Sequence, residues 1–183
     1  MNGTVYLASA DSALLRRALE GCSGGSCLEM GTGNGGALLE LSKRFGLVVG
    51  TDVLRPEMAD WKEAGANYIL GDVASCLRPS IFDLVAFNPP YVAAKLANDR
   101  AVEGGERLEV SKAFLRDALR VVKRSGVVIF LLNDDANPLE FEKICAEYGF
   151  SMQAKESERV FFEELTVFLA RASAESDQRP SSS

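Results

Sequence analysis

Histidine is absent from this chain of 183 residues. Its absence excludes Ser-His-Asp triads, general base catalysis by imidazole and zinc sites that depend on histidine ligands. Any chemistry must therefore come from carboxylates, amides, tyrosine, lysine, backbone groups or a bound cofactor.

Cysteine is scarce and shows no metal-binding pattern. The four cysteines form no C-x-x-C pair and lie in or beside apolar segments. This placement predicts reduced, mostly buried thiols rather than a disulfide framework or a metal site, so we expect no bound metal. The residues concerned are Cys22, Cys27, Cys76 and Cys145.

Long apolar runs are also missing. The longest, residues 127–132 and 81–87, are far shorter than a membrane-spanning helix. The N-terminus has no basic segment followed by an apolar stretch, as a signal peptide would have. We expect a soluble, cytoplasmic protein, with the nucleus as an alternative location.

Basic residues are outnumbered, with 20 Lys and Arg against 26 Asp and Glu, a net charge of -6. This balance argues against a protein that holds a long nucleic acid unaided, because such binding depends on cations that neutralise phosphates. A protein or small-molecule substrate suits the chain better. Its length and apolar content predict one domain over residues 1–172, followed by a polar, Ser-rich, disordered tail over 173–183.

Apolar segments of strand length alternate with longer segments of helical period. This alternation predicts an α/β fold with a doubly wound, seven-stranded, mostly parallel sheet. Because few residues separate the last two strands, we expect them to form a C-terminal antiparallel hairpin. The expected strands are 26–30, 47–51, 67–70, 81–87, 127–132, 150–156 and 161–170.

Helices are expected between these strands. Asp11 or Ser12 can cap the first helix, which Gly21 ends. A second helix would bury its apolar positions, and the polar loop 93–106 is a candidate mobile lid. The second helix carries Leu38, Leu39, Leu41 and Phe45, and further helices are expected at 56–61, 109–123 and 139–148.

A glycine-rich loop over residues 29–36 joins the first strand to the second helix, where open α/β sheets bind ligands. Gly31, Gly33 and Gly36 satisfy G-x-G-x-x-G, and Asp52 follows Gly31 by 21 residues, so a dinucleotide is a fair alternative. Together with Thr32, these residues are candidates for cofactor contacts.

Acidic side chains favour S-adenosylmethionine over a dinucleotide. Glu29 suits the cationic amino end of S-adenosylmethionine, whereas it would repel a pyrophosphate. Asp72 ends the third strand, where its carboxylate could accept a hydrogen bond from an adenine amino group. With Asp52, three acids end successive strands, and together they favour a ligand over solvated strand ends.

Asn88, Pro89, Pro90 and Tyr91 follow the fourth strand, across the switch point from the glycine loop. An asparagine oxygen and a proline-restrained carbonyl can accept both N–H hydrogens of a planar amide and stabilise the charge that builds on its nitrogen. Tyr91 offers a face for stacking. These four residues are the candidate catalytic set, for methyl transfer to a flat nitrogen.

The chain resembles the HemK-type glutamine methyltransferases, and within them the short eukaryotic and archaeal branch that modifies the class 1 translation termination factor. The resemblance covers nearly the whole chain, and the opening segment is more specific than the Asn-Pro-Pro-Tyr motif. It is carried by residues 5–6, 11–15, 27–35, 51–52, 71–73, 83–92, 104–105 and 164–167.

The resemblance implies methylation of the glutamine amide in the factor's Gly-Gly-Gln tripeptide, with a small zinc-binding activator subunit as partner. Asn88 and Pro89 would hold the amide. The chain departs from the pattern where Leu7, Ala8 and Ala10 replace a Glu-Pro and a further acid, and where Val102 replaces a Trp. By position, the implied cofactor contacts are Ser12, Glu29, Gly31, Asp52, Asp72 and Val73, with Asn88 beside them.

Other functions stay open on the sequence. The Asn-Pro-Pro-Tyr motif is shared with methyltransferases that act on adenine N6 or guanine N2, so RNA or DNA is an alternative substrate. Lysine methylation is a second alternative within the resembling branch. A catalytically silent scaffold, which uses the fold only to bind a partner, is the alternative outside the enzymes.

Overall fold

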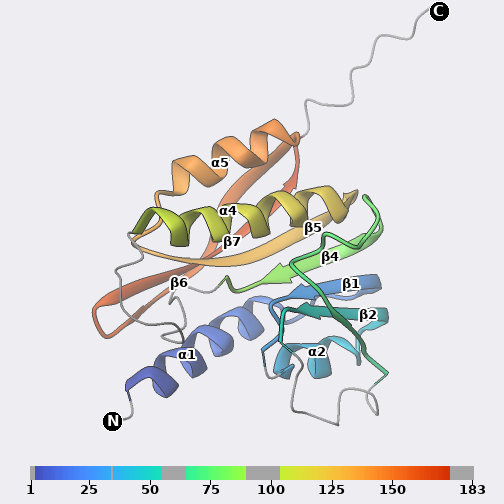
Figure 1. The fold of residues 1–183 in the computed structure, drawn as a ribbon, viewed down its shortest axis with the longest axis horizontal. Coiled ribbons are helices and arrows are strands. Elements are labelled where there is room, and N and C mark those ends of the chain that lie inside the picture. Colours follow the sequence, from blue (N-terminus) through green and yellow to red (C-terminus); the bar gives the residue numbers. More distant parts are fainter. Residues whose placement is uncertain (1–2, 34, 55–64, 90–103, 174–183) are drawn as a thin grey trace, which may run out of the picture.

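A seven-stranded sheet forms the centre of the computed structural model, which describes residues 3–33, 35–54, 65–89 and 104–173. The strand order is β3-β2-β1-β4-β5-β7-β6, and only β7 runs against its neighbours (Figure 1). The strands are β1 Gly24–Met30, β2 Phe45–Asp52, β3 Asn67–Leu70, β4 Phe82–Phe87, β5 Val122–Asn133, β6 Phe150–Val160 and β7 Glu163–Ala172. The predicted fold class and antiparallel hairpin are confirmed.

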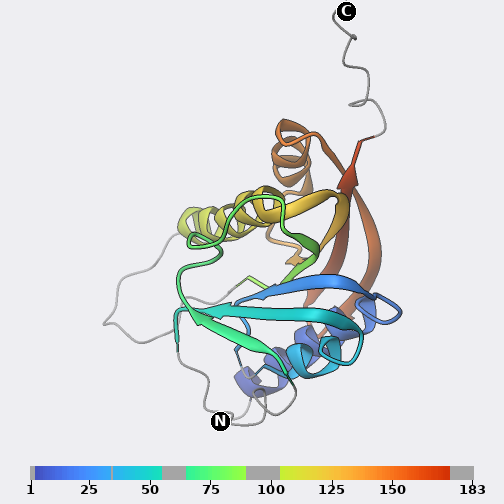
Figure 2. The same ribbon diagram turned by 90° about the vertical axis from the view of Figure 1, so that its right-hand side faces the viewer.

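Helices cover both faces of the sheet, as the doubly wound prediction requires (Figure 2). Leu115 of α4 and Phe141 of α5 pack into the core on one face, and Leu14 of α1 and Leu38 of α2 into the core on the other. Because the central strands are buried on both faces, their sequences are apolar without alternation. The helices are α1 Gly3–Ala18, α2 Gly36–Leu41, α4 Gly104–Val121 and α5 Pro138–Glu147.

The expected caps of the first helix are wrong. The helix begins at Gly3, so Asp11 and Ser12 lie inside it. Asp11 is half-buried inside the helix, and burial and the charge of Glu163 raise its pKa to about 6. The helix expected at 109–123 begins earlier, at Gly104, and ends at Val121, since helix boundaries are the part of a helix that sequence patterns locate least well.

Phe45 does not lie on the second helix. That helix ends at Leu41, and Phe45 is the buried first residue of β2. Its spacing from Leu41 fits a helical period, but the ring packs under Gly24, where an added Cβ would lie 3.1 Å from the ring. A small residue on β1 thus leaves room for the aromatic side chain on β2.

Six of the seven strands differ from their predicted bounds by one or more residues, and β3 alone matches. β5 begins at Val122 instead of Val127, with an irregularity in its pairing with β4. β6 continues to Val160, and β7 begins at Glu163. Phe161 and Phe162, which look like strand residues, form the exposed turn between them, and Phe161 has a left-handed φ of 56°.

Several predicted features lie outside the described residues. These are the helix at 56–61, residues 93–103 of the candidate lid, and the tail from residue 174. Within the described ranges, no helix has the length and apolar character needed to cross a membrane.

Candidate cofactor and acceptor site

The glycine loop and the Asn-Pro corner lie side by side. β1 and β4 are parallel neighbours, and Met30 pairs with Phe87 at their carboxyl ends. Gly31 and Asn88 follow directly, and a Cβ on Gly31 would lie 3.9 Å from the backbone oxygen of Asn88. The chain order reverses between these two strands, which is where open α/β sheets bind ligands.

Backbone hydrogen bonds shape the glycine loop. The Gly31 N–H donates to the Thr51 carbonyl at 2.8 Å, and the Gly35 N–H donates to the Thr32 carbonyl at 2.8 Å. Gly31 and Gly33 have φ values of 70° and 51°, in the region that favours glycine. The loop thereby turns sharply without side chains between its backbone and a ligand.

Glu29 is the buried carboxyl group of this site. It is 7% exposed, and burial raises its pKa to about 8. The backbone N–H of Leu38 and the charge of Arg16 favour the carboxylate, whereas Asp52 and Glu40 oppose it. Its Oε2 atom has no hydrogen-bond partner among the described residues. A cationic group at this position would stabilise the carboxylate and fill the unused acceptor.

Asp52 organises the loop from the end of β2. Its Oδ2 atom accepts a hydrogen bond from the Gly33 N–H at 2.9 Å, and its Oδ1 atom accepts one from Leu54 N–H at 2.9 Å. Each carboxylate oxygen can accept a second bond. The contact of Asp52 with a cofactor stays a prediction. The structure shows in addition that Asp52 holds the conformation of the glycine loop.

Asp72 and Val73 lie in the turn that follows β3. Asp72 is exposed, and Val73 has a φ of 50°, a strained conformation for a β-branched residue. The Asp117 carboxylate accepts from the Ala74 N–H at 3.0 Å, and Arg120 donates to the carbonyls of Ala74 and Leu77 at 2.7 Å. The contacts of Asp117 and Arg120 with this turn were not predicted from the sequence, because an Asp and an Arg three residues apart on a helix usually lie on a solvent-exposed face.

Asn88 follows the end of β4 and is half-buried. Its Oδ1 atom is buried without a hydrogen-bond partner in the described chain, and its side chain opposes the rise in the pKa of Asp11. Pro89 is buried beside it. The other two candidate catalytic residues, Pro90 and Tyr91, lie outside the described residues. Neither Asp11 nor Arg16 was predicted to lie at the site from helix α1.

Four buried polar atoms without partners gather at this end of the sheet. In the described chain they are Glu29 Oε2, Thr32 Oγ1, Thr51 Oγ1 and Asn88 Oδ1. Buried polar groups in native proteins are nearly always hydrogen-bonded, so such a cluster is suited to bind a ligand. These residues fit S-adenosylmethionine. The Glu29 carboxylate can bind its ammonium group, and the glycine loop lets the backbone come close to the ligand. Ser12 is exposed on α1, next to Asp11.

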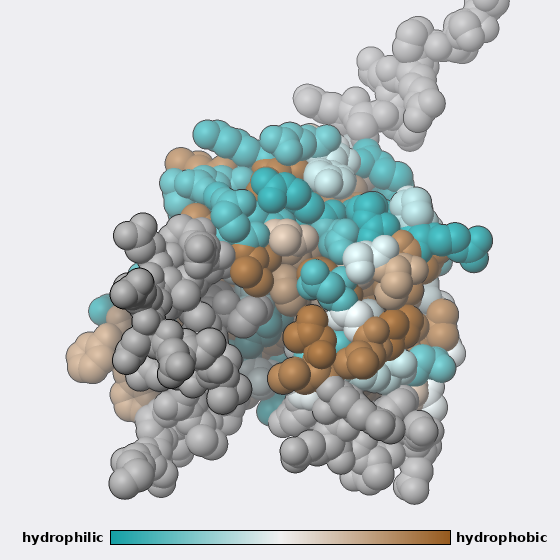
Figure 3. Space-filling view, viewed as in Figure 1, coloured by the Kyte–Doolittle hydropathy of each residue, from teal (hydrophilic) through white to brown (hydrophobic). Residues whose placement is uncertain are grey.

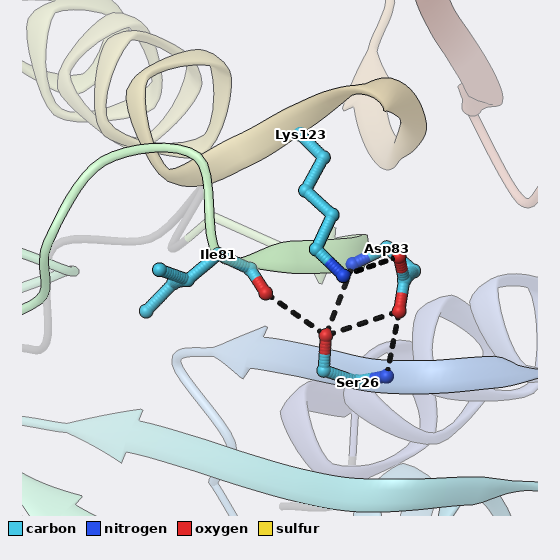
Figure 4. Close-up of polar contacts among 4 residues, drawn as sticks. All are labelled: Ser26, Ile81, Asp83 and Lys123. Atoms are coloured by element: carbon cyan, nitrogen blue, oxygen red, sulfur yellow. Dashed lines mark hydrogen bonds and ion pairs between the residues drawn. The ribbon is translucent and has the colours of Figure 1, made fainter.

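The opposite ends of the same strands carry a polar cluster of a different kind (Figure 4). Asp83 accepts hydrogen bonds from the Ser26 N–H at 2.8 Å and the Ser26 hydroxyl at 3.1 Å, and pairs with Lys123 at 2.7 Å. The Ser26 hydroxyl also lies 2.9 Å from the Ile81 carbonyl. Lys123 and Ser26 lower the pKa of Asp83. Its bonds hold β1, β4 and the start of β5 together.

No protein-family model and no curated protein matches the sequence. Among solved structures, the chain is similar to the methyltransferase of the E. cuniculi Mtq2-Trm112 complex, which methylates the eRF1 termination factor. The identity is 27%, the TM-score 0.69, and the match covers 90% of this chain and 96% of that one.

Two further structures were solved with S-adenosylmethionine. The T. Thermophilus 16S rRNA N2 G1207 methyltransferase RsmC is 24% identical, with a TM-score of 0.64, over 89% of this chain and 43% of that one. The Synechocystis magnesium protoporphyrin IX methyltransferase ChlM is 15% identical, with a TM-score of 0.61, over 90% and 79%.

The chain has the class I methyltransferase fold. S-adenosylmethionine is the cofactor of that class, and the likeness to the Mtq2-Trm112 enzyme confirms the resemblance to the HemK-type release-factor methyltransferases. The dinucleotide alternative loses its support, since the glycine loop belongs to a sheet with the C-terminal antiparallel hairpin of the methyltransferases. No set of three or more Cys, Asp or Glu side chains suited to a metal ion occurs in the described part of the chain.

Proposed function

We propose that this chain is a cytoplasmic, S-adenosylmethionine-dependent methyltransferase acting on the glutamine side-chain amide of the Gly-Gly-Gln motif in a class 1 translation release factor. The observation that carries the proposal is the buried, unpartnered Oδ1 atom of Asn88, next to the glycine loop. The likeness to an enzyme that methylates eRF1 supports the choice of substrate.

The site residues suit an amide acceptor. Bound S-adenosylmethionine supplies an electrophilic methyl group on a sulfonium. The Asn88 Oδ1 atom accepts one N–H of the glutamine amide, and the Pro89 carbonyl accepts the other, which orients the nitrogen. The bond between the methyl carbon and the donor sulfur would break as the new N–C bond forms, the neutral thioether would leave, and the nitrogen would release one proton to solvent. Glu29 would hold the ammonium group of the cofactor, and Asp72 would accept a hydrogen bond from its adenine amino group.

We also propose a small zinc-binding activator protein as a partner. The solved relative is a complex with Trm112, and large apolar side chains are exposed on β2, just after β2 and on β3, where apolar surface is visible (Figure 3). Its exposed large apolar residues are Leu47, Val53, Leu54 and Leu70. The opposite edge strand, β6, carries charged residues at 155, 156, 158 and 159, which protect a sheet edge from unwanted pairing.

The test is methyl transfer to a purified release factor. Enzyme co-expressed with the activator is incubated with labelled S-adenosylmethionine and the factor, and mass spectrometry maps the modification. We expect one methyl group on the glutamine of Gly-Gly-Gln. A factor with alanine in place of that glutamine is the control, and label on it at the same level would contradict the proposal.

A nucleic-acid amine is the second candidate, because the Asn88 corner also fits the flat exocyclic amine of adenine. The RsmC structure holds guanosine and S-adenosylmethionine on the same fold. Total RNA and DNA, and a lysine-rich protein, belong in the same assay. Label in RNA or DNA alone would favour methylation of adenine N6. Label on lysine would favour a protein-lysine methyltransferase. If the chain did not bind S-adenosylmethionine at all, a catalytically silent scaffold would be favoured.

A further inference from the structure

The turn between β3 and β4 is held from outside the sheet. β3 is a strand of four residues at the edge of the sheet, next to β2. The chain leaves it at Gly71, whose N–H donates to the Asp52 carbonyl at 2.9 Å, and then runs alongside α4 before β4 begins (Figure 2). Contacts with α4 therefore help to fix residues 72–77, which include Asp72, the predicted partner of the adenine amino group.

Two side chains of α4 bind the backbone of this turn. The Asp117 Oδ2 atom accepts from the Ala74 N–H at 3.0 Å. The Nη2 and Nη1 atoms of Arg120 donate to the carbonyls of Ala74 and Leu77, each at 2.7 Å. Within the pair, the Arg120 Nε atom donates to Asp117 Oδ1 at 3.0 Å. Each side chain thus holds the other in place, and together they bind three backbone groups of the turn. We call this pair the α4 clamp.

The turn needs such support, because Val73 has a backbone conformation that is unfavourable for its residue type. Its φ of 50° lies in the left-handed region, which β-branched residues rarely adopt. A residue keeps such a conformation only when its surroundings determine it. The α4 clamp holds both backbone groups of the next residue, Ala74, and the Val73 side chain packs against the core. The clamp thus fixes the direction in which Asp72 and Val73 leave the turn.

A pair that only stabilised α4 would not explain these contacts. Side chains three residues apart on a helix can pair with each other and need no further partner. Asp117 and Arg120 are instead partly buried, with side-chain exposures of 24% and 32%, and both also bind the turn. The planar guanidinium of Arg120 donates to two carbonyls at once, which a lysine ammonium would match less well.

We propose that Asp117 and Arg120 are positioning residues, which set the affinity and selectivity of the site for the adenine base by holding Asp72 and Val73 in place. The inference deepens the proposed function, on which it rests for the contact between Asp72 and the adenine amino group. The methyl acceptor plays no part in it, so cofactor binding alone provides the test.

The test compares the binding of S-adenosylhomocysteine and S-inosylhomocysteine, in which a carbonyl oxygen replaces the adenine amino group. Because the Asp72 carboxylate favours the amino group, the full chain in complex with the activator should bind the adenosine compound about 10- to 100-fold more tightly by calorimetry. Arg120→Met removes both bonds from Arg120 to the turn and should lower this selectivity ratio at least about fivefold. Arg120→Lys can still donate to one carbonyl, so it should keep more of the ratio.

The matched control is Arg124→Met on β5. Arg124 donates to the carbonyls of Tyr148 and Gly149, each at 3.0 Å, in the turn between α5 and β6. This variant also loses two bonds from an arginine to a turn, but it should keep the wild-type ratio. An unchanged ratio in Arg120→Met, or an equal fall in Arg124→Met, would overturn the inference in favour of general stabilisation.

A double variant tests whether the clamp acts through Asp72. In Asp72→Ala the selectivity ratio should already be near one, because the group that distinguishes the two bases is gone. Adding Arg120→Met should then change the ratio no further, since both substitutions act on one interaction. A further fall of the same size as in the wild-type background would contradict the role of the clamp in placing Asp72.

Amide hydrogen exchange without cofactor tests the clamp independently of the adenine contact. Relative to the buried amides of β1, which report any global loss of stability, the Ala74 N–H should exchange at least about tenfold faster in Asp117→Ala and Arg120→Met. It should keep the wild-type rate in Arg124→Met. Unchanged exchange at Ala74 in both clamp variants would refute the positioning role. Failure of methyl transfer to the release factor, with the expected exchange and selectivity, would refute only the substrate.

Discussion

The two ends of strands β1 and β4 carry polar clusters with opposite properties. At the amino ends, Asp83 has partners in Ser26 and Lys123. At the carboxyl ends, Asn88 Oδ1 and Glu29 Oε2 are buried without partners in the described chain. The same two strands thus end in a saturated cluster on one side and an unsatisfied one on the other, and only the second is suited to bind a ligand.

The difference has a physical cost. A buried polar group without a partner costs about 1–3 kcal/mol, so a fold does not keep several of them without compensation. Binding of a ligand that fills them supplies that compensation. Substitutions at the saturated end should therefore change stability, and substitutions at the unsatisfied end should change binding or turnover.

The largest effect is expected from Asn88→Ala. Loss of the oxygen that orients the acceptor should lower kcat by about 100- to 1000-fold, as for other preorganised groups of this kind. S-adenosylmethionine affinity should stay nearly unchanged, because the amide acts on the acceptor. Steady-state kinetics and calorimetry measure the two quantities, and equal losses in both would contradict the assigned role.

The next effect is the pH dependence of cofactor binding. The pKa of Glu29 is about 8 in the unliganded protein, and a bound ammonium group requires the carboxylate. Affinity should therefore rise with pH, by up to about tenfold per unit below pH 8, and fall again once the amino group of the cofactor loses its own proton at about pH 8 or above. Calorimetry between pH 6 and 9 tests this expectation. A wild-type profile as flat as that of Glu29→Gln would show that Glu29 does not bind the cation.

Glu29→Gln should also stabilise the protein without cofactor. The folded pKa of about 8 exceeds the reference value of 4.5, so the stability that the protonated carboxyl contributes is present below pH 4.5 and lost as pH rises through 8. At pH 8.5 the variant should melt at a higher temperature than the wild type, by roughly 2–4 °C for each kcal/mol gained. The difference should shrink at pH 5, and a melting temperature below that of the wild type at pH 8.5 would contradict it.

Asp83→Ala should have the smallest effect and act on stability alone. We expect a loss of about 1 kcal/mol, because Asp83 is partly exposed and solvent weakens its ion pair with Lys123. Its pKa is lowered, so its contribution is present above the reference pKa of 3.8 and disappears as pH falls through the folded value. Chemical denaturation at pH 7 and pH 3 measures the change. If Asp83→Ala also lowered the affinity for the cofactor, the two ends of β1 and β4 would not differ in the way described.

The fold class and the position of the site were predictable from the sequence because both are indicated by local patterns. β3 was predicted with its observed bounds, and the glycine loop and Asn88 lie on neighbouring strands as expected. Local patterns failed where distant contacts decide. Asp11 looked like a helix cap although it lies inside α1, and Asp117 and Arg120 looked like a surface pair although they hold the turn after β3.

Helix α4 joins parts of the site that are far apart in the chain. Phe114 packs against Gly31, Asp117 and Arg120 hold the turn after β3, and Lys112 pairs with Glu140 of α5. A small rotation of α4 would therefore move together the residues near the amino-acid end of the cofactor and those near its adenine end. Both sides of the site thus share α4 as a support, and we expect a change in α5 at Glu140 to act on cofactor affinity through this helix.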